Sequence, residues 1–191
     1  MEANLTMQII GLTGPARSGK STVAGMLNQH GYEVYGFADA LKSAVKAMLI
    51  PLGIAVLEHL DDEARKEIEI DGLGVSPRYL WQTLGTEWGR ERIRSDFWIR
   101  ILAAQIERDR RSNFIPHIVV ADVRFANEAR WIIEQGGEVW RIVRPGYEST
   151  ARSHSSEAGV PAAFLGQGVV NDGDMEALAE RVQLLLGLRA E

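Results

Sequence analysis

The sequence contains no cysteine, which excludes disulfide bonds, thiolate zinc sites and cysteine nucleophiles. It has no apolar run long enough to span a membrane, and its first residues do not place a basic segment before an apolar one. The formal net charge of −5 disfavours stable binding to nucleic acid, which requires a basic face. We therefore expect a cytoplasmic protein that binds neither a membrane nor nucleic acid stably.

Internal repeats and low-complexity segments are also lacking, so the composition is that of an ordinary globular chain. Its 191 residues are 46% apolar and 25% charged, which is enough for one core and short for two independent domains. We expect a single domain over residues 1–191. The four histidines are scattered without the spacing of metal ligands, and no structural zinc site is expected.

Residues 14–21 read GPARSGKS and match the phosphate-loop pattern G-x-x-x-x-G-K-[ST]. An apolar run at residues 8–12 precedes the pattern, and residues 22–29 follow it with helical spacing. In such a loop, backbone N–H groups and a helix N-terminus bind phosphate oxygens. A chance glycine-rich turn is the alternative, but the flanking elements favour a site for a nucleoside triphosphate. The residues expected to bind it are Gly14, Ala16, Arg17, Ser18, Gly19, Lys20, Ser21 and Thr22.

Strand-like and helix-like segments alternate along the chain, which favours a parallel sheet flanked by helices. Strands are expected at residues 8–12, 33–37, 117–122 and 138–143, with a last strand ending at 169–170. Helices are expected at 22–29, 39–49, 78–94, 97–108, 127–135 and 175–186, with Asp39 as the N-cap of the second. Together these elements predict an α/β protein with a five-stranded parallel sheet in the three-layer α/β/α fold of phosphate-loop NTPases.

Asp122 ends a buried apolar strand, where a carboxylate could hold Mg²⁺ opposite the hydroxyl of Ser21. A carboxylate that caps the next helix is the alternative. Val123 follows Asp122, so the second acid that would orient a water molecule for hydrolysis is missing, and transfer to a bound acceptor is favoured. No Asn-Lys-x-Asp motif occurs, which disfavours a GTPase switch.

Arginines are the expected partners of two anions brought together for phosphoryl transfer. Arg17 lies within the loop and Arg124 follows the strand tip by two residues, so these two are better placed than the others. Asp39 follows the second strand and either binds a hydroxyl or caps its helix. The segment from Trp81 to Trp88 suits the binding of a base, although tryptophans seven residues apart more often belong to a core.

The chain resembles the bacteriophage deoxynucleoside monophosphate kinases in several segments that occur in the same order. These segments read GLTGPARSGKST from residue 11, FADALK from 37, RYLWQTLGTEWGRERIRSDFW from 78, VVADVRFANE from 119, GGEVWRIVRPG from 136, HSSEAG from 154 and NDGDMEAL from 171. The resemblance implies transfer of the γ-phosphoryl group of ATP to a deoxynucleoside 5′-monophosphate. It also implies Mg²⁺, a nucleoside-monophosphate-kinase-like fold with mobile acceptor-binding and lid segments, and a homodimer.

The same resemblance implies roles for individual residues. Lys20 and Arg17 clamp the phosphates, Ser21 and Asp122 hold Mg²⁺, and Arg124 and Asp39 join Lys20 and Arg17 as catalytic residues. A segment of about residues 53–98 binds the acceptor, and a segment of about residues 146–168 forms the lid. Arg144 belongs to the lid and to the donor site. The residues expected at the acceptor are Asp39, Lys42, Arg78, Gln82, Thr86, Arg124, Asn127, His154 and Glu157, and those expected near the adenine are Asn171, Asp172 and Gly173.

Two other functions stay open at this point. Dephospho-coenzyme A kinase resembles the chain in the GLTG…SGKST opening and in the Asn-Asp-Gly turn, and its hydroxyl acceptor would make Asp39 a base. A nucleotide-binding regulatory protein with little transfer activity is the second alternative, which fast ATP hydrolysis without an acceptor would support. Residues 78–98 favour the bacteriophage family over dephospho-coenzyme A kinase.

Overall fold

The computed structural model describes residues 8–53, 60, 64–113, 115, 117–147 and 159–188. The chain forms two compact units. Residues 1–36 and 105–191 form the first unit, and Phe37–Ala104 form the second. Each unit has a hydrophobic core of its own. In the described part of the chain, no helix combines the length and the apolar character that a membrane span requires.

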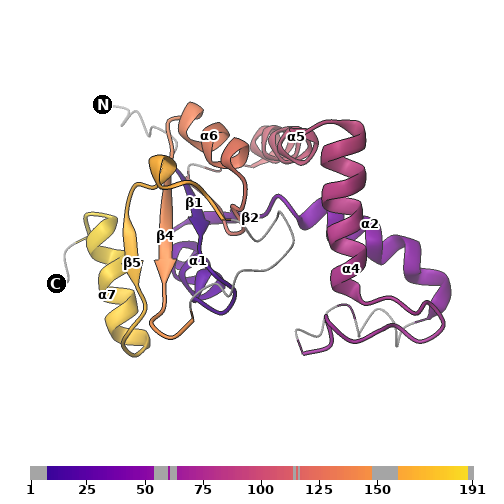
Figure 1. The fold of residues 1–191 in the computed structure, drawn as a ribbon. Coiled ribbons are helices and arrows are strands. Elements are labelled where there is room, and N and C mark those ends of the chain that lie inside the picture. The colour runs from indigo at the N-terminus through magenta and orange to yellow at the C-terminus, as the bar shows by residue number, and fades with distance from the viewer. Residues whose placement is uncertain are drawn as a thin grey trace. The chain divides into compact units, whose positions relative to one another are not determined.

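The first unit contains a five-stranded sheet in which every described pair of neighbouring strands is parallel. Its strands are β1 (Gln8–Thr13), β2 (Tyr32–Tyr35), β3 (His117–Val120), β4 (Glu138–Val143) and β5 (Gly168–Val170). Their spatial order is β2-β3-β1-β4-β5, so β1 is central (Figure 1). The predicted five-stranded parallel sheet is therefore confirmed, and the segment that follows β1 leaves the sheet at its middle.

Helices cover both faces of this sheet. Ile10 and Leu12 of β1 pack with side chains of α1 (Lys20–Gln29) and α7 (Met175–Leu185). Because successive strand residues face opposite sides, Gly11 faces the other layer, where a Cβ atom would lie 2.5 Å from Ile132 of α6 (Ala126–Glu134). The sheet thus lies between α1 with α7 and α6 (Figure 1), which confirms the three-layer α/β/α fold.

The described part of the second unit contains several helices, together with turns and an isolated antiparallel bridge between Ile70 and Val75. It contains α2 (Asp39–Leu49), the short 3₁₀ helix η1 (Ile50–Leu52), α4 (Pro77–Gln82), the π-helix η2 (Thr83–Ile93) and the first part of α5 (Phe97–Ser112). Ser76 caps α4 by accepting a hydrogen bond from the N–H of Tyr79, and Pro77 occupies the first turn, where its missing N–H costs nothing. The buried core side chains are Leu41, Val45, Leu49, Leu60, Ile70 and Trp98.

Two predictions about this unit were wrong in detail. Asp39 is not the N-cap of α2: Ala38 holds that position without a side-chain hydrogen bond, and Asp39 lies in the first turn, where its charge favours the helix dipole. The helix predicted for residues 78–94 continues as a π-helix after Gln82. The Nε1–H of Trp98 donates to the carbonyl of Gly85 at 2.7 Å, and a Cβ at Gly89 would lie 2.6 Å from the same nitrogen. The indole of Trp98 therefore packs directly against the backbone of the π-helix η2.

Candidate functional site

The phosphate loop, residues 14–21, connects β1 to α1 and requires unusual backbone conformations. Gly14, Arg17 and Gly19 have positive φ angles of 146°, 63° and 104°. A Cβ at Gly14 would lie 2.3 Å from the carbonyl oxygen of Ile142 in β4, so glycine is needed there for close approach as well as for conformation. The pattern that predicted this loop therefore has a direct steric basis in the fold.

Lys20, the first residue of α1, reaches back over the loop. Its Nζ donates to the carbonyl of Gly14 at 2.8 Å and to that of Pro15 at 2.7 Å. Ser18 is fully buried, whereas Ala16, Arg17 and Ser21 are exposed. The ammonium group thus lies over the start of the loop, and the N-terminus of α1 lies at its end. Both carry positive charge or partial charge, which favours the binding of phosphate groups.

The turn after β3 is held between the ends of two strands. Ala121 donates its N–H to the carbonyl of Tyr35 at 2.8 Å, and Val123 donates to that of Leu12 at 3.0 Å. Asp122, half-buried, stands between these two anchored residues. Because β1 and β3 are parallel neighbours and both segments follow the same ends of these strands, Asp122 and the phosphate loop lie at the same edge of the sheet.

Glu128 is a buried acidic residue that the sequence analysis did not single out. Its side chain is buried in α6, and its Oε2 accepts hydrogen bonds from the N–H groups of Arg124 at 2.7 Å and Phe125 at 2.9 Å. These bonds shape the turn that carries Arg124 itself, whose side chain is exposed, and the nearby Asn127, which is half-buried. The available signal in the sequence was the position of an acidic residue next to Ala129, on the face of α6 that is buried.

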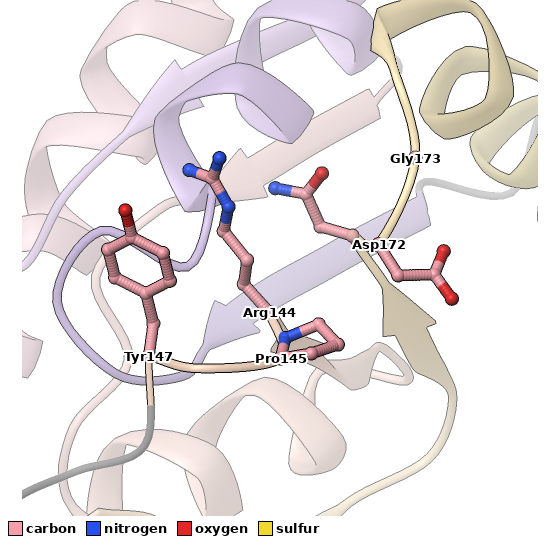
Figure 2. A pocket seen from close by; sticks show the side chains of 6 residues that line it. Arg144, Pro145, Tyr147, Asp172 and Gly173 are labelled. Carbon is pink, nitrogen blue, oxygen red and sulfur yellow. The ribbon is translucent and has the colours of Figure 1, made fainter.

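A cavity of about 240 Å³ opens next to the turn between β5 and α7 (Figure 2). It is lined by Arg144, Pro145, Tyr147, Asn171, Asp172 and Gly173. The guanidinium of Arg144 lies 4.7 Å from the ring centre of Tyr147, close enough for a cation–π contact. Pockets for whole ligands are typically about 300–1,000 Å³, so this cavity is smaller than a site for a whole ligand. Pro145 and Tyr147 were not predicted to belong to the donor site, whereas Arg144, Asn171, Asp172 and Gly173 were.

Hydrogen bonds and an ion pair join the turn after β5 to the rest of the first unit. Asn171 donates its backbone N–H to Val143 at 2.7 Å and its Nδ2 to the carbonyl of Ser18 at 3.0 Å. Asp172 forms an ion pair with Arg181 of α7 at 2.5 Å, and this hydrogen-bonded guanidinium lowers the pKa of Asp172 below its ordinary value. Figure 2 shows the carboxylate of Asp172 pointing away from Arg144. Asp172 therefore lines the cavity with atoms other than its charged carboxylate group.

The residues predicted for the acceptor lie mostly in the second unit. Asp39 and Lys42 are exposed in the first turn of α2, and Gln82 is half-buried at the end of α4. Arg78 is half-buried, forms an ion pair with Glu67 and also bonds Lys66 through its backbone N–H. Thr86 is buried within η2. His154 and Glu157 lie outside the described residues.

The two tryptophans of the predicted base-binding segment differ. Trp81 packs against the core of the second unit, which is the structural role considered as the alternative. Trp88 is 43% exposed, and its ring meets that of Phe97 edge-on with centres 5.5 Å apart. Trp88 is therefore the more accessible of the two, because Trp81 is half-buried against the core.

The donor set at the sheet edge suits Mg²⁺. Ser21 and Asp122 offer hydroxyl and carboxylate oxygens, which are the hard ligands that this ion prefers. Across the described residues no group of three or more histidine, cysteine or acidic side chains gathers into a metal cage. Mg²⁺ needs none, because it usually takes one or two protein ligands and completes its shell with water and substrate phosphate.

A parallel sheet whose central strand runs into a G-x-x-x-x-G-K-S loop and then a helix defines a phosphate-loop nucleotide-binding protein. Solved structures show the same fold. A Thermus thermophilus crystal structure matches with a TM-score of 0.55 and 20% identity, covering 95% of this chain and 97% of that one. Dephospho-CoA kinase from Campylobacter jejuni matches with a TM-score of 0.50 and 13% identity, covering 95% and 96%.

Comparisons of sequence then identify the family. A family model for deoxynucleotide monophosphate kinases matches residues 54–182. A putative deoxynucleotide monophosphate kinase of Acanthamoeba polyphaga mimivirus is 33% identical over 160 residues, covering 79% of this chain and 81% of its own. The chain therefore belongs to the deoxynucleotide monophosphate kinase family, as its resemblance indicated.

Phage proteins are also similar to the chain. A deoxynucleoside-5′-monophosphate kinase of Escherichia phage T5 is 32% identical over 116 residues, and a deoxynucleotide monophosphate kinase of Escherichia phage RB69 is 32% identical over 111 residues. The matches span 44% and 45% of these two relatives, so each phage protein is more than half unmatched.

Proposed function

We propose that this protein transfers the γ-phosphoryl group of ATP to a deoxynucleoside 5′-monophosphate, giving ADP and a deoxynucleoside diphosphate. The observation that carries the proposal is the phosphate loop of a kinase family, with Lys20 reaching over it and Asp122 at the same sheet edge. Val123 in place of a second acid supports transfer rather than hydrolysis.

The first unit would bind the donor. Lys20 and Arg17 would neutralise negative charge on the phosphates. The backbone N–H groups of the loop are held in place by the fold. They would therefore stabilise the negative charge that develops in the transition state with little reorganisation. Ser21 and Asp122 would hold Mg²⁺, which supplies further charge neutralisation when bound. The cavity beside Arg144 and the turn of Asn171, Asp172 and Gly173 would receive the base of ATP.

The second anion needs positioning more than activation. A nucleoside monophosphate is already ionised at neutral pH, so no strong general base is required to deprotonate it. Guanidinium groups such as Arg124 and Arg78 would hold its phosphate in line with the donor, and an arginine at the transferred group is worth on the order of 10³ to 10⁵ in rate. Asp39, Lys42, Gln82, Thr86 and Asn127 would complete the acceptor site, with Asp39 on a sugar hydroxyl.

The remaining expectations belong to the same proposal. A segment of about residues 53–98 would bind the acceptor, and one of about 146–168, with His154 and Glu157, would close over the site to exclude water. The protein would work as a homodimer in the cytoplasm, which is the host cytoplasm if a phage encodes it.

A coupled assay of ADP release tests the proposal. The purified protein is supplied with Mg²⁺ and ATP, and in separate reactions with each deoxynucleoside monophosphate, with dephospho-coenzyme A or with no acceptor. We expect ADP release that depends on at least one deoxynucleoside monophosphate. Release that depends only on dephospho-coenzyme A would assign the acceptor to that cofactor precursor instead. Fast release without any acceptor would favour a regulatory nucleotide-binding protein.

A further inference from the structure

We propose that Asn171 is a positioning residue that holds the phosphate loop in its binding conformation, rather than a residue that recognises the donor base. The inference rests on the proposed function in one respect, namely that the loop binds the phosphates of ATP. It deepens that function because Asn171, which lines the cavity proposed for the base of ATP, receives a role at the triphosphate.

The contact joins two parts of the chain that are 153 residues apart. The Nδ2 of Asn171 donates a hydrogen bond of 3.0 Å to the carbonyl oxygen of Ser18. Asn171 is itself anchored, since its backbone N–H donates to the carbonyl of Val143 at 2.7 Å. The side chain therefore extends from a fixed point at the end of β5 to the middle of the phosphate loop.

Gly19 provides a second, independent observation of how closely this amide packs. A Cβ at Gly19 would lie 2.5 Å from Nδ2 of Asn171 and 3.5 Å from its Cγ. The φ angle of 104° at Gly19 is also one that other residues rarely adopt. The last glycine of the loop pattern is thus required both by the backbone and by the space that Asn171 occupies.

The direction of one peptide plane follows from the contact. In a trans peptide the C=O and the next N–H point in opposite directions. When the carbonyl of Ser18 is held toward Asn171, the N–H of Gly19 must point away from Asn171. We assign to Asn171 the task of keeping this N–H directed at the phosphate oxygens. The amide suits that task because its NH₂ group can face a carbonyl, whereas an oxygen in the same place would repel it.

The test uses Asn171→Leu, which keeps the number of side-chain heavy atoms and adds no charge but cannot donate a hydrogen bond. Asn171→Ala is the second variant, in case the leucine side chain prevents folding. Asn28→Leu is the matched control, because Nδ2 of Asn28 makes the same kind of bond, to the carbonyl of Tyr32 at 2.9 Å, at the far end of α1. Amide hydrogen exchange is followed by NMR in the protein without ligand.

The amides of Ser18 and Val23 report on the loop, because they donate to the carbonyls of Pro15 and Gly19. We expect both to exchange about tenfold faster in Asn171→Leu than in the wild type, and to be unchanged in Asn28→Leu. Equal exchange in the wild type and both Asn171 variants would overturn the proposal. This result does not depend on catalysis, so it decides the matter even if no acceptor is phosphorylated.

Inhibition then separates the phosphate end of the donor from the base end. Mg²⁺ tripolyphosphate and adenosine are each tested as competitors of ATP in the wild type and in Asn171→Leu. We expect the inhibition constant of tripolyphosphate to rise about tenfold, and that of adenosine to change little. A rise for adenosine with none for tripolyphosphate, or an equal rise for both, would contradict the role at the phosphate loop. A wild type that binds neither compound would contradict the proposed function instead.

Discussion

Glu128 offers the most direct measurement of how a buried side chain shapes the site, through the variant Glu128→Gln. The carboxylate accepts two N–H bonds in a buried position, from Arg124 and Phe125. Hydrogen bonds to a charged group contribute roughly 1.5–3 kcal/mol, and those to a neutral group roughly 0.5–1.5 kcal/mol. Glutamine can still accept both bonds but without charge, so we expect a loss of about 2 kcal/mol. Glu128→Leu removes the acceptor of both N–H groups and should cost roughly 2–6 kcal/mol, since each unsatisfied N–H costs about 1–3 kcal/mol.

Urea denaturation followed by tryptophan fluorescence gives the free energy of unfolding. The control is Glu134→Gln, which removes a carboxylate from the same helix at an exposed position. Surface substitutions of this kind usually stay within about 0.5 kcal/mol. The rate of phosphoryl transfer should also fall more in Glu128→Gln than in Glu134→Gln, because Arg124 lies in the turn that Glu128 holds. Equal stabilities for the two variants would refute the reasoning.

Three further predictions follow from other parts of the molecule. Lys20→Ala should lower transfer by at least about 10²-fold while the far-ultraviolet circular dichroism stays that of the wild type; wild-type turnover in this variant would refute the role of Lys20. Gly89→Ala should lower the stability of the second unit, because the new Cβ would meet the rigid indole of Trp98, and calorimetric titration with ATP should show unchanged donor affinity; reduced affinity would show that the two units are coupled. Arg181→Leu should return the pKa of Asp172 toward its ordinary value of 3.8, measured by NMR of the carboxyl carbon. Because Arg181 lowers the pKa of Asp172 in the folded protein, the ion pair stabilises the fold at pH values above the ordinary pKa of aspartate. This stabilisation is lost as the pH falls through the lowered pKa of the folded protein. If the pKa of Asp172 is the same in Arg181→Leu as in the wild type, the pairing is excluded.

The layered architecture was predictable because its signals are local. The apolar runs of β1 and β4 are bounded by glycines and by the phosphate-loop pattern, and each was expected within one residue of where it lies. The loop could be identified from eight consecutive residues, because positive φ angles and close backbone contacts require glycine at two of its positions. The end of β3 also indicated that Asp122 lies at the same sheet edge as the loop, and its role there stays a prediction.

Other features depend on partners far away in sequence. The π-helix η2 carries the same apolar spacing as an α-helix, and Trp98, which packs against it, comes after the helix has ended. Glu128 was missed because the residue before its helix is Phe125, so the usual capping pattern of a polar residue three positions earlier is absent. The bond from Asn171 to Ser18 has no local signature at all, since only the folded sheet brings β5 beside the loop.

The separate core of the second unit has an evolutionary consequence. Its described members all come from one uninterrupted stretch, Phe37–Ala104, while the strand-and-loop scaffold is built from the chain on either side. If the acceptor binds in this stretch, as proposed, substitutions that change the base preference can accumulate there without altering the phosphate loop. A mutant library confined to residues 37–104 is accordingly the place to seek altered nucleotide preference.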